Sequence, residues 1–227
     1  FWPANTVNDD DIELYTDETR SEVAMTWYGM RQQTEKQVIE GVMRPSRCLA
    51  DFVAPKDSGL KDYVGVFAVT AGLGVEKKEK YFIDDLDDYS AIMLKALADR
   101  LAEAFAESLH HRVRTDLWGY AADEALSNED MIAEKYRGIR PAPGYPACPD
   151  HSVKREMFEL MQCADIGMTL TESLAMTPAA SVSGFHLSHP ASTYFNVGKI
   201  GHDQLADQAA RRRLPESELE RLLAPNL

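Results

Sequence analysis

One stiff stretch, RPAPGYPACPDH at residues 140–151, gathers the side chains best suited to chemistry. Four of its twelve residues are proline. Neither a helix nor a central strand accommodates that density, because proline lacks an N–H and fixes φ. A backbone fixed in advance loses little entropy on binding, which suits a ligand site. In such a site Arg140 can form a bidentate hydrogen bond to a carboxylate, and Tyr145 can stack on a planar group. The stretch is therefore either a ligand cradle or a rigid connector whose arginine pairs with a surface carboxylate.

Three potential metal ligands follow one another at helical spacing. Glu103, Glu107 and His111 stand at i, i+4 and i+8, and ESLH at 107–110 has the Glu-x-x-His spacing of di-iron carboxylate bundles. Such a site needs that motif twice and two further carboxylates, whereas we find it here once. A solvated, charged helix face is the better interpretation, and we expect no metal site.

The remaining reactive side chains form no catalytic pattern. Cys148 and His151 resemble a nucleophile and its base, but nothing nearby in the sequence orients the pair, so we expect an inert cysteine. His186 and His189 lie three apart on an expected strand and therefore face opposite sides. The GLG sequence at 72–74 lacks the third glycine of a dinucleotide-binding fingerprint. We expect no catalytic residue.

The elements that position these residues can be predicted from apolar periodicity and turn signals. Strands are expected at 11–16 and 63–72, where apolar and polar residues alternate or β-branched residues cluster. The other predictions are a helix over 20–41, a short strand over RCLADFVAP ending at Pro55, helices at 128–137 (with Ser127 and Asp130 as a capping box) and 152–163, a strand pair within 171–200 turning at HPAS, and two helices within 201–224. This order indicates an α+β fold with a mainly antiparallel sheet.

The clearest element is a helix over 87–114. Its first turn is acidic and its last turn carries His and Arg, as the helix dipole favours. Its apolar residues recur at three and four positions, which predicts one apolar face packed on the core. These residues are Ile92, Ala96, Leu97, Leu101, Ala104, Phe105 and Leu109.

Composition limits the classes of function. The 37 acidic residues against 24 basic ones give a formal charge of -13, which disfavours nucleic acid as a partner and suits a cationic ligand. The three cysteines form no CxxC motif, so we expect neither a disulfide framework nor a classical zinc site, and we expect a reducing, cytoplasmic compartment. No apolar run approaches the ~20 residues of a membrane helix, and no signal-peptide pattern opens the chain. We therefore expect no membrane partner.

GIRPAPGYPACPDH resembles the signature of the activation domain of cobalamin-dependent methionine synthase. LADFVAP, FAVTAG, LTESLAM and LAPNL resemble further motifs of that domain in the same order, so the resemblance covers nearly the whole chain. It implies a C-shaped, single-domain α+β fold around a twisted antiparallel sheet flanked by helices. It also implies that residues 1–227 are an activation domain that lacks its N-terminal helical part.

The resemblance implies a part in methionine biosynthesis from homocysteine. In this family the domain binds S-adenosylmethionine and presents its methyl group to cob(II)alamin during reductive reactivation of the methyltransferase. The cobalamin is carried on another module, and the electron comes from flavodoxin or a flavoprotein reductase. Zinc belongs only to the homocysteine module, which this chain lacks, so the chain alone makes no methionine. The alternative hypothesis is a docking module for the cobalamin module or flavodoxin that binds no ligand of its own.

The resemblance also assigns residues to the ligand site by position in the motifs. Asp51, in LADFVAP, matches an acidic residue that contacts S-adenosylmethionine, and a carboxylate there suits the ligand's ammonium and sulfonium. Arg140 matches the arginine that holds the ligand's carboxylate. Ala142 offers backbone hydrogen bonds, and Tyr145 lies by the ligand and close to the docked cobalamin.

The other assigned residues come from the second half of the resemblance. Tyr194, in STYFNVGKI, matches a tyrosine of the ligand pocket. Phe195 stands where the family often has a second tyrosine, so a hydroxyl is missing at this position. Glu103 and Glu134 match acidic residues near the site.

Overall fold

The computed structural model of the chain describes residues 1–35, 38–39 and 41–227. These residues form two compact units, each built from stretches that are far apart in the sequence. Unit 1 consists of Phe1–Gly65, Gly138–Val153 and Phe185–Leu227, and unit 2 consists of Val66–Arg137 and Lys154–Gly184. The proline-rich stretch at 140–151 therefore lies entirely in unit 1.

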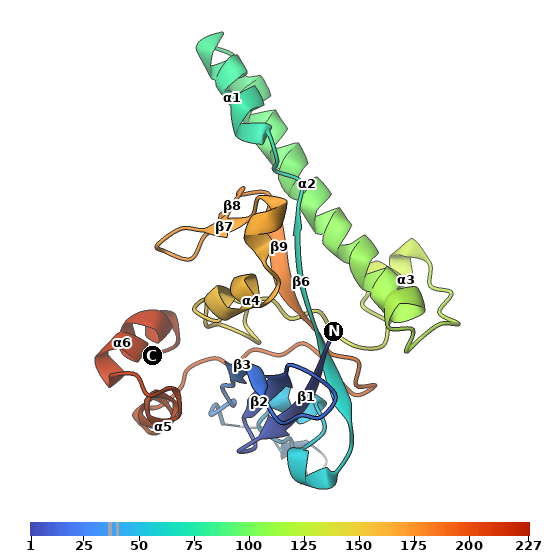
Figure 1. The fold of residues 1–227 in the computed structure, drawn as a ribbon, viewed down its shortest axis with the longest axis vertical. Helices are drawn as coiled ribbons and strands as arrows, with labels where there is room; N and C mark the ends of the chain where they lie inside the picture. Colours follow the sequence, from blue (N-terminus) through green and yellow to red (C-terminus); the bar gives the residue numbers. More distant parts are fainter. Residues whose placement is uncertain (36–37, 40) are drawn as a thin grey trace. The chain divides into compact units, whose positions relative to one another are not determined.

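A five-stranded antiparallel sheet carries the fold, with the strand order β3-β2-β1-β6-β9 (Figure 1). Its strands are β1 (Trp2–Val7), β2 (Asp11–Tyr15), β3 (Val23–Tyr28), β6 (Asp62–Thr70) and β9 (Ser181–His186). The predicted α+β class and the strands expected at 11–16 and 63–72 are confirmed. Asn8 and Asp9 join β1 to β2 with φ of 50° and 61°, a left-handed conformation that Asn and Asp tolerate.

The helix predicted over 20–41 is wrong, because its first part is strand β3. Met25 and Trp27 are buried, whereas Ala24, Thr26 and Tyr28 are only half-buried, so the side chains alternate with the period of a strand. Pairing with β2 stabilises this conformation beyond what local periodicity indicates. Two short strands, β4 (Val38–Ile39) and β5 (Val42–Met43), pair further along. Residues 36, 37 and 40 of the predicted helix lie outside the described residues.

The short strand predicted over RCLADFVAP is also wrong. Leu49–Phe52 forms a 3₁₀ helix, η1, and Lys56–Ser58 forms another, η2. The carboxylate of Asp51 accepts a hydrogen bond from the backbone N–H of Cys48 at 2.8 Å, which folds the chain back at the start of η1. Local capping by this aspartate therefore outweighs the β-type composition of the segment.

Unit 2 contains a long helix, α2 (Asp88–Arg112), beside α1 (Val75–Asp84), which the sequence did not predict. Asp87 caps α2 by accepting a hydrogen bond from the backbone N–H of Ser90 at 3.0 Å. The predicted helix is confirmed, and its last turn leads into a π-helical segment, Val113–Leu117.

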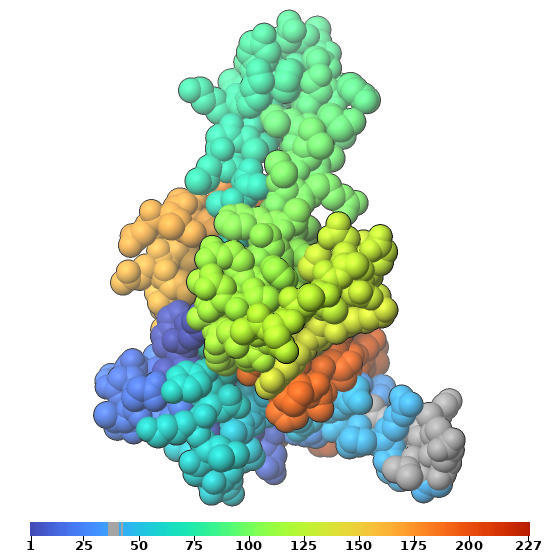
Figure 2. Space-filling model, turned by 90° about the vertical axis from the view of Figure 1, so that its right-hand side faces the viewer, coloured from blue at the N-terminus to red at the C-terminus, as the bar shows by residue number. Residues whose placement is uncertain are grey.

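The face of α2 that packs is not the predicted one. Four large apolar residues of the predicted face are 51% to 64% exposed: Ile92, Leu97, Leu101 and Phe105. Small residues are buried instead, namely Ala91, Ala98, Ala102 and Ala106. Ala106 packs against Phe67 and Val69, and Ala98 and Ala102 pack against Ala180 of the same unit. Alanine permits a close approach of helix to sheet, so unit 2 buries the alanine face of α2. Figure 2 looks onto a surface that includes α2 in green.

The other elements of unit 2 are short. The helix predicted at 128–137 is α3 (Asn128–Ile132), with the predicted capping box, and the helix predicted at 152–163 is α4 (Lys154–Leu160). A 3₁₀ turn, η4 (Cys163–Ile166), and a two-stranded pair, β7 (Thr169–Leu170) with β8 (Met176–Thr177), follow.

The strand pair predicted within 171–200 is wrong in its second arm. Residues 181–186 form β9, and a turn follows at 190–191 as predicted, but residues 192–200 have no strand partner. They run along the proline-rich stretch, where the backbone N–H of Val197 donates to Pro146 at 2.9 Å.

The predicted C-terminal helices are α5 (His202–Arg212) and α6 (Glu216–Leu223), followed by η5 (Ala224–Asn226). They close a buried cluster in unit 1 that includes Met30, Val197, Ile200, Leu205 and Leu219. No described helix has the combined length and apolar character needed to cross a membrane.

Candidate functional site

The proline-rich stretch is held at its start by β9 and closed by a turn in its middle. The backbone N–H of Phe185 donates to Pro141 at 2.9 Å, and the N–H of Gly144 donates to Cys148 at 2.8 Å. Gly144 has a φ of 95°, and a Cβ at this position would collide with the ring of His151. Only glycine therefore fits both the backbone angle and the packing of His151.

The end of the stretch is anchored by the C-terminal helices. Arg212, on α5, donates to Asp150 at 2.8 Å and to Ser152 at 2.6 Å, and the three side chains are largely buried. Asp150 also accepts a hydrogen bond from the backbone N–H of Ser152 at 2.7 Å. The loop is thus tied to β9 at one end and to α5 at the other, as a preorganised binding loop requires.

Two residues that the sequence assigned to one site are in contact. The backbone N–H of Arg140 donates to the phenolic oxygen of Tyr194 at 2.9 Å. Tyr145, at the loop tip, has 57% of its surface exposed. The carbonyl of Ala142 accepts the Tyr145 N–H at 3.2 Å, so Ala142 shapes the tip as well as offering backbone groups.

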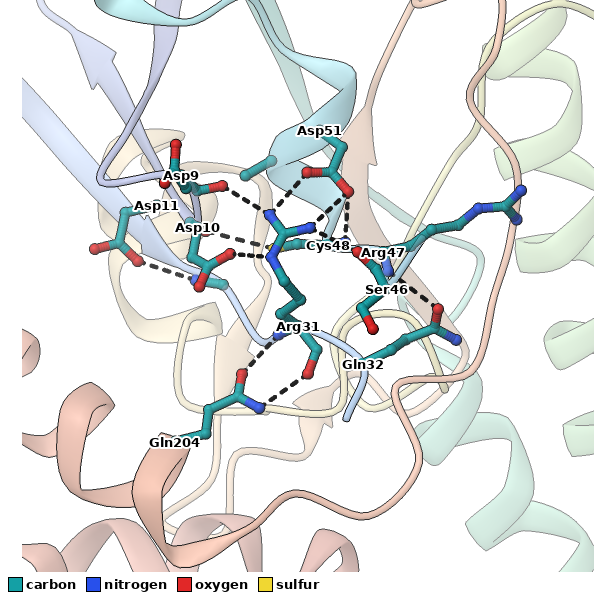
Figure 3. A network of polar contacts seen from close by, with 12 residues as sticks. Asp9, Asp10, Asp11, Arg31, Gln32, Ser46, Arg47, Cys48, Asp51 and Gln204 are labelled. Atoms are coloured by element: carbon teal, nitrogen blue, oxygen red, sulfur yellow. Dashed lines mark hydrogen bonds and ion pairs between the residues drawn. The ribbon is translucent and has the colours of Figure 1, made fainter. Parts of the chain in front are cut away.

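Asp51 lies on η1 with both carboxylate oxygens engaged (Figure 3). Arg31 donates to them at 2.7 and 3.0 Å, and Cys48 donates at 2.8 Å. The side chain keeps 35% exposure, and it borders a pocket of about 790 Å³ that Arg31 also lines. An ordered carboxylate at an open pocket is suited to hold a cationic group.

Arg31 is not among the site residues predicted from the sequence. It stands three residues after the end of β3, within a segment predicted as helix. A signal was present in the run Asp9, Asp10 and Asp11, because adjacent carboxylates repel one another and a nearby cation stabilises them. Arg31 supplies it to Asp10 at 2.7 Å.

Aromatic contacts connect Asp51 with the Tyr194 segment within unit 1. Phe52, next to Asp51, meets Phe195 edge to face, with ring centroids 6.5 Å apart. It also stacks on His189 at 6.2 Å. Phe195 packs against the buried cluster of the C-terminal helices as well. The ring at position 195 is therefore used in packing, which requires no hydroxyl.

Glu103 and Glu134 belong to unit 2, whereas the other six assigned residues belong to unit 1. Glu103 is exposed on α2 and borders a pocket of about 350 Å³, together with Ser181 of the same unit. Glu134 is exposed just after α3, with a φ of 53°. Their membership of the ligand site stays a prediction.

The described cysteines are poorly suited to act as nucleophiles. Burial raises the pKa of Cys48 and of Cys148 to about 12, which keeps both thiols protonated near neutral pH. Burial also raises the pKa of Cys163. Within the described part of the chain, no group of three His, Cys, Asp or Glu side chains is arranged to hold a metal ion.

Comparison with known proteins shows the family of the chain. Residues 1–213 match the family described as vitamin B12-dependent methionine synthase, activation domain. The chain is also similar to the MetH reactivation domain in a crystal structure with bound AdoHcy (S-adenosylhomocysteine). The two are 56% identical with a TM-score of 0.93, over 100% of this chain and 68% of that chain. The resemblance of the sequence motifs is therefore confirmed, and the chain belongs to the family of activation domains of vitamin B12-dependent methionine synthase, a methyltransferase.

Proposed function

We propose that this chain binds S-adenosylmethionine and presents its methyl group to cobalamin during reductive reactivation of methionine synthase. The observation that carries the proposal is the similarity, over the whole chain, to a reactivation domain bound to AdoHcy. AdoHcy is what remains of S-adenosylmethionine after its methyl group has left, so one site serves both. The residues proposed to bind the ligand are Asp51, Arg140, Ala142, Tyr145, Tyr194 and Phe195, with Glu103 and Glu134 as further acidic residues.

The chemistry of the ligand fits the residues of unit 1. Arg140 would pair with the ligand's carboxylate, and Asp51 would balance its ammonium or sulfonium charge. Tyr145, exposed at the loop tip, would lie beside the ligand's planar base. A sulfonium is already a good electrophile, so these residues act by holding the methyl group in position.

The partners follow from the family. A cobalamin-binding module of the same methyltransferase would receive the methyl group, and the cobalt it carries supplies the methyl acceptor. Flavodoxin or a flavoprotein reductase would supply the electron. The buried, fixed ends of the loop at 140–151 leave its tip as the part able to meet such a module.

Calorimetric titration of the chain with S-adenosylmethionine tests the proposal. We expect saturable binding by the wild type. Arg140→Ala should weaken it about tenfold to a hundredfold, the usual value of hydrogen bonds to a charged group. Arg112→Ala removes a surface arginine paired with Asp116 in unit 2 and is the matched control, with affinity unchanged. A folded wild type that binds no ligand would contradict the proposal and favour a docking module instead.

A further inference from the structure

We propose that Arg31 is a positioning residue for the ligand site. It holds the Asp51 carboxylate in one orientation, and together with Asp10 it keeps the cluster at one net negative charge. The inference rests on the proposed function, because it assumes that Asp51 meets a cationic part of the ligand. It concerns how that aspartate is prepared for binding.

The first support is the saturation of the guanidinium group. An arginine side chain has five N–H donors in a rigid fork, and each of the five has an acceptor here (Figure 3). Nε donates to Asp10 at 2.7 Å. The terminal nitrogens donate to both oxygens of Asp51 at 2.7 and 3.0 Å, to the Ser46 carbonyl at 2.8 Å and to the Asp9 carbonyl at 3.0 Å. A group bound in this way has one orientation.

The second support is the anchoring of the Arg31 backbone. The side chain of Gln204, on α5, accepts from the Arg31 N–H at 2.6 Å and donates to the Arg31 carbonyl at 2.9 Å. Met30, the preceding residue, is buried in the cluster of the C-terminal helices. The guanidinium therefore extends from a fixed base, and the carboxylate it holds is fixed as well.

Charge balance gives Asp10 a role. An arginine paired with Asp51 alone would cancel the charge that a cationic ligand needs. Asp10 makes a second ion pair with the same guanidinium, so Asp10, Arg31 and Asp51 together carry one net negative charge. The hydrogen bonds to Asp51, together with the negative charges of Asp10 and Asp51, also raise the pKa of Arg31, so the arginine stays charged.

The segment that carries Arg31 also reaches the other half of the site. The side chain of Gln32 donates to the Asn196 carbonyl at 2.6 Å and accepts from the Arg47 N–H at 3.1 Å. Two consecutive residues thus fix η1 on one side and the segment after Tyr194 on the other. This arrangement suits a residue that sets the spacing of the site.

A double-mutant cycle with S-adenosylmethionine tests the proposal. Arg31→Lys keeps the charge but loses the fork, and Asp51→Asn keeps the shape but loses the charge. We expect each to weaken binding about tenfold, as residues that act as a coupled pair do. The double variant should bind no more weakly than Asp51→Asn alone, because Arg31 acts only through Asp51. Free energies of binding that add in the double variant would overturn the proposal.

Arg20→Lys is the matched control for loss of stability. Arg20 also lies in unit 1, and it donates to the carbonyls of Ala4 and Asp62 rather than to Asp10 or Asp51. It should lower the Tm as Arg31→Lys does, with the affinity unchanged. If Arg31→Lys binds like the wild type while Asp51→Asn does not, the positioning role fails and the proposed function stands. If the folded wild type does not bind, both fail.

Asp10→Asn keeps the inference testable should Arg31→Lys not fold. It preserves the shape of the cluster and changes its net charge from minus one to zero. We expect weaker binding of S-adenosylmethionine with a smaller dependence on salt, because a charge has been removed. Unchanged affinity and unchanged salt dependence in a folded Asp10→Asn variant would overturn the role given to the charge.

Discussion

The backbone N–H of Arg140 donates a hydrogen bond to the hydroxyl of Tyr194, 54 residues further along the chain. The bond joins the first residue of the proline-rich loop to the segment that runs along it. It fixes the backbone from which the Arg140 side chain extends against the hydroxyl of the tyrosine. A substitution of Tyr194 should therefore alter the position of Arg140.

Tyr194→Phe should both destabilise the protein slightly and weaken ligand binding. Losing the acceptor of a partly buried N–H costs about 1 kcal/mol. Urea unfolding and calorimetric titration measure the two effects. Tyr89→Phe is the control, because Tyr89 is 73% exposed on α2, and it should leave both quantities unchanged. Equal free energies of unfolding and equal affinities of the two variants would show that the Arg140–Tyr194 hydrogen bond contributes to neither.

Gly144→Ala should disrupt the loop more than its backbone angle alone explains. Alanine at a positive φ costs about 1 kcal/mol, and here the added Cβ also collides with His151. Gly59→Ala isolates the first effect, since Gly59 has a φ of 70° with nothing near its Cβ position. We expect Gly144→Ala to lower the free energy of unfolding further than Gly59→Ala does. His151→Ala in the same chain should restore part of the difference, and no restoration would contradict the collision.

A buried ion pair in unit 2 gives a prediction about stability. Arg114 is fully buried, and Glu124 is 6% exposed and holds it at 2.8 Å. The guanidinium also lies 4.3 Å from the ring centroid of Tyr136. Glu124→Ala would leave a buried charge unpaired and should cost about 3 to 5 kcal/mol in chemical denaturation. Asp116→Ala removes only an exposed carboxylate paired with Arg112, so it should cost less than about 1 kcal/mol.

The buried thiols predict a dependence on pH. The pKa of Cys48 and of Cys148 is raised from 9.0 to about 12 by burial. Unfolded thiols therefore lose their protons first, and the stability present below pH 9 should decline as the pH rises from 9 toward 12. Thiol labelling at pH 8 should be slow in the folded protein and fast in denaturant. Rapid labelling of folded Cys148, followed by peptide mapping, would contradict its burial.

The sequence predicted the periodic elements better than those set by tertiary contacts. The helix at 87–114 and the strands at 11–16 and 63–72 are present because their local patterns agree with the fold. Residues 23–28 were assigned to a helix, since nothing local shows that β2 is their partner. The prediction of which face of α2 is buried was also wrong. Apolar periodicity favours large residues, whereas close packing here selects alanine.

The candidate site shows the same contrast between residues with a local sequence signal and residues defined by tertiary contacts. Arg140 and Tyr145 stood out because a proline-rich loop is unusual in itself, and Asp51 and Tyr194 came from the resemblance. Arg31 was missed because its importance depends on a carboxylate 20 residues away, which no local pattern connects to it. Contacts of this kind become visible only when the chain has folded.

The discontinuous construction of unit 1 also has a consequence for the timing of biosynthesis. Its residues come from three stretches interrupted by unit 2. Gln204 reaches back to Arg31, which holds Asp51, and Arg212 reaches back to Asp150 in the loop. A ribosome adds roughly 5 to 20 residues per second. Until α5 has been synthesised, the nascent chain carries Asp51 and then Arg140 without the helix that fixes their surroundings. The pocket is thus one of the last features the growing polypeptide can complete, whereas the α1–α2 pair of unit 2 can form while it is still tethered.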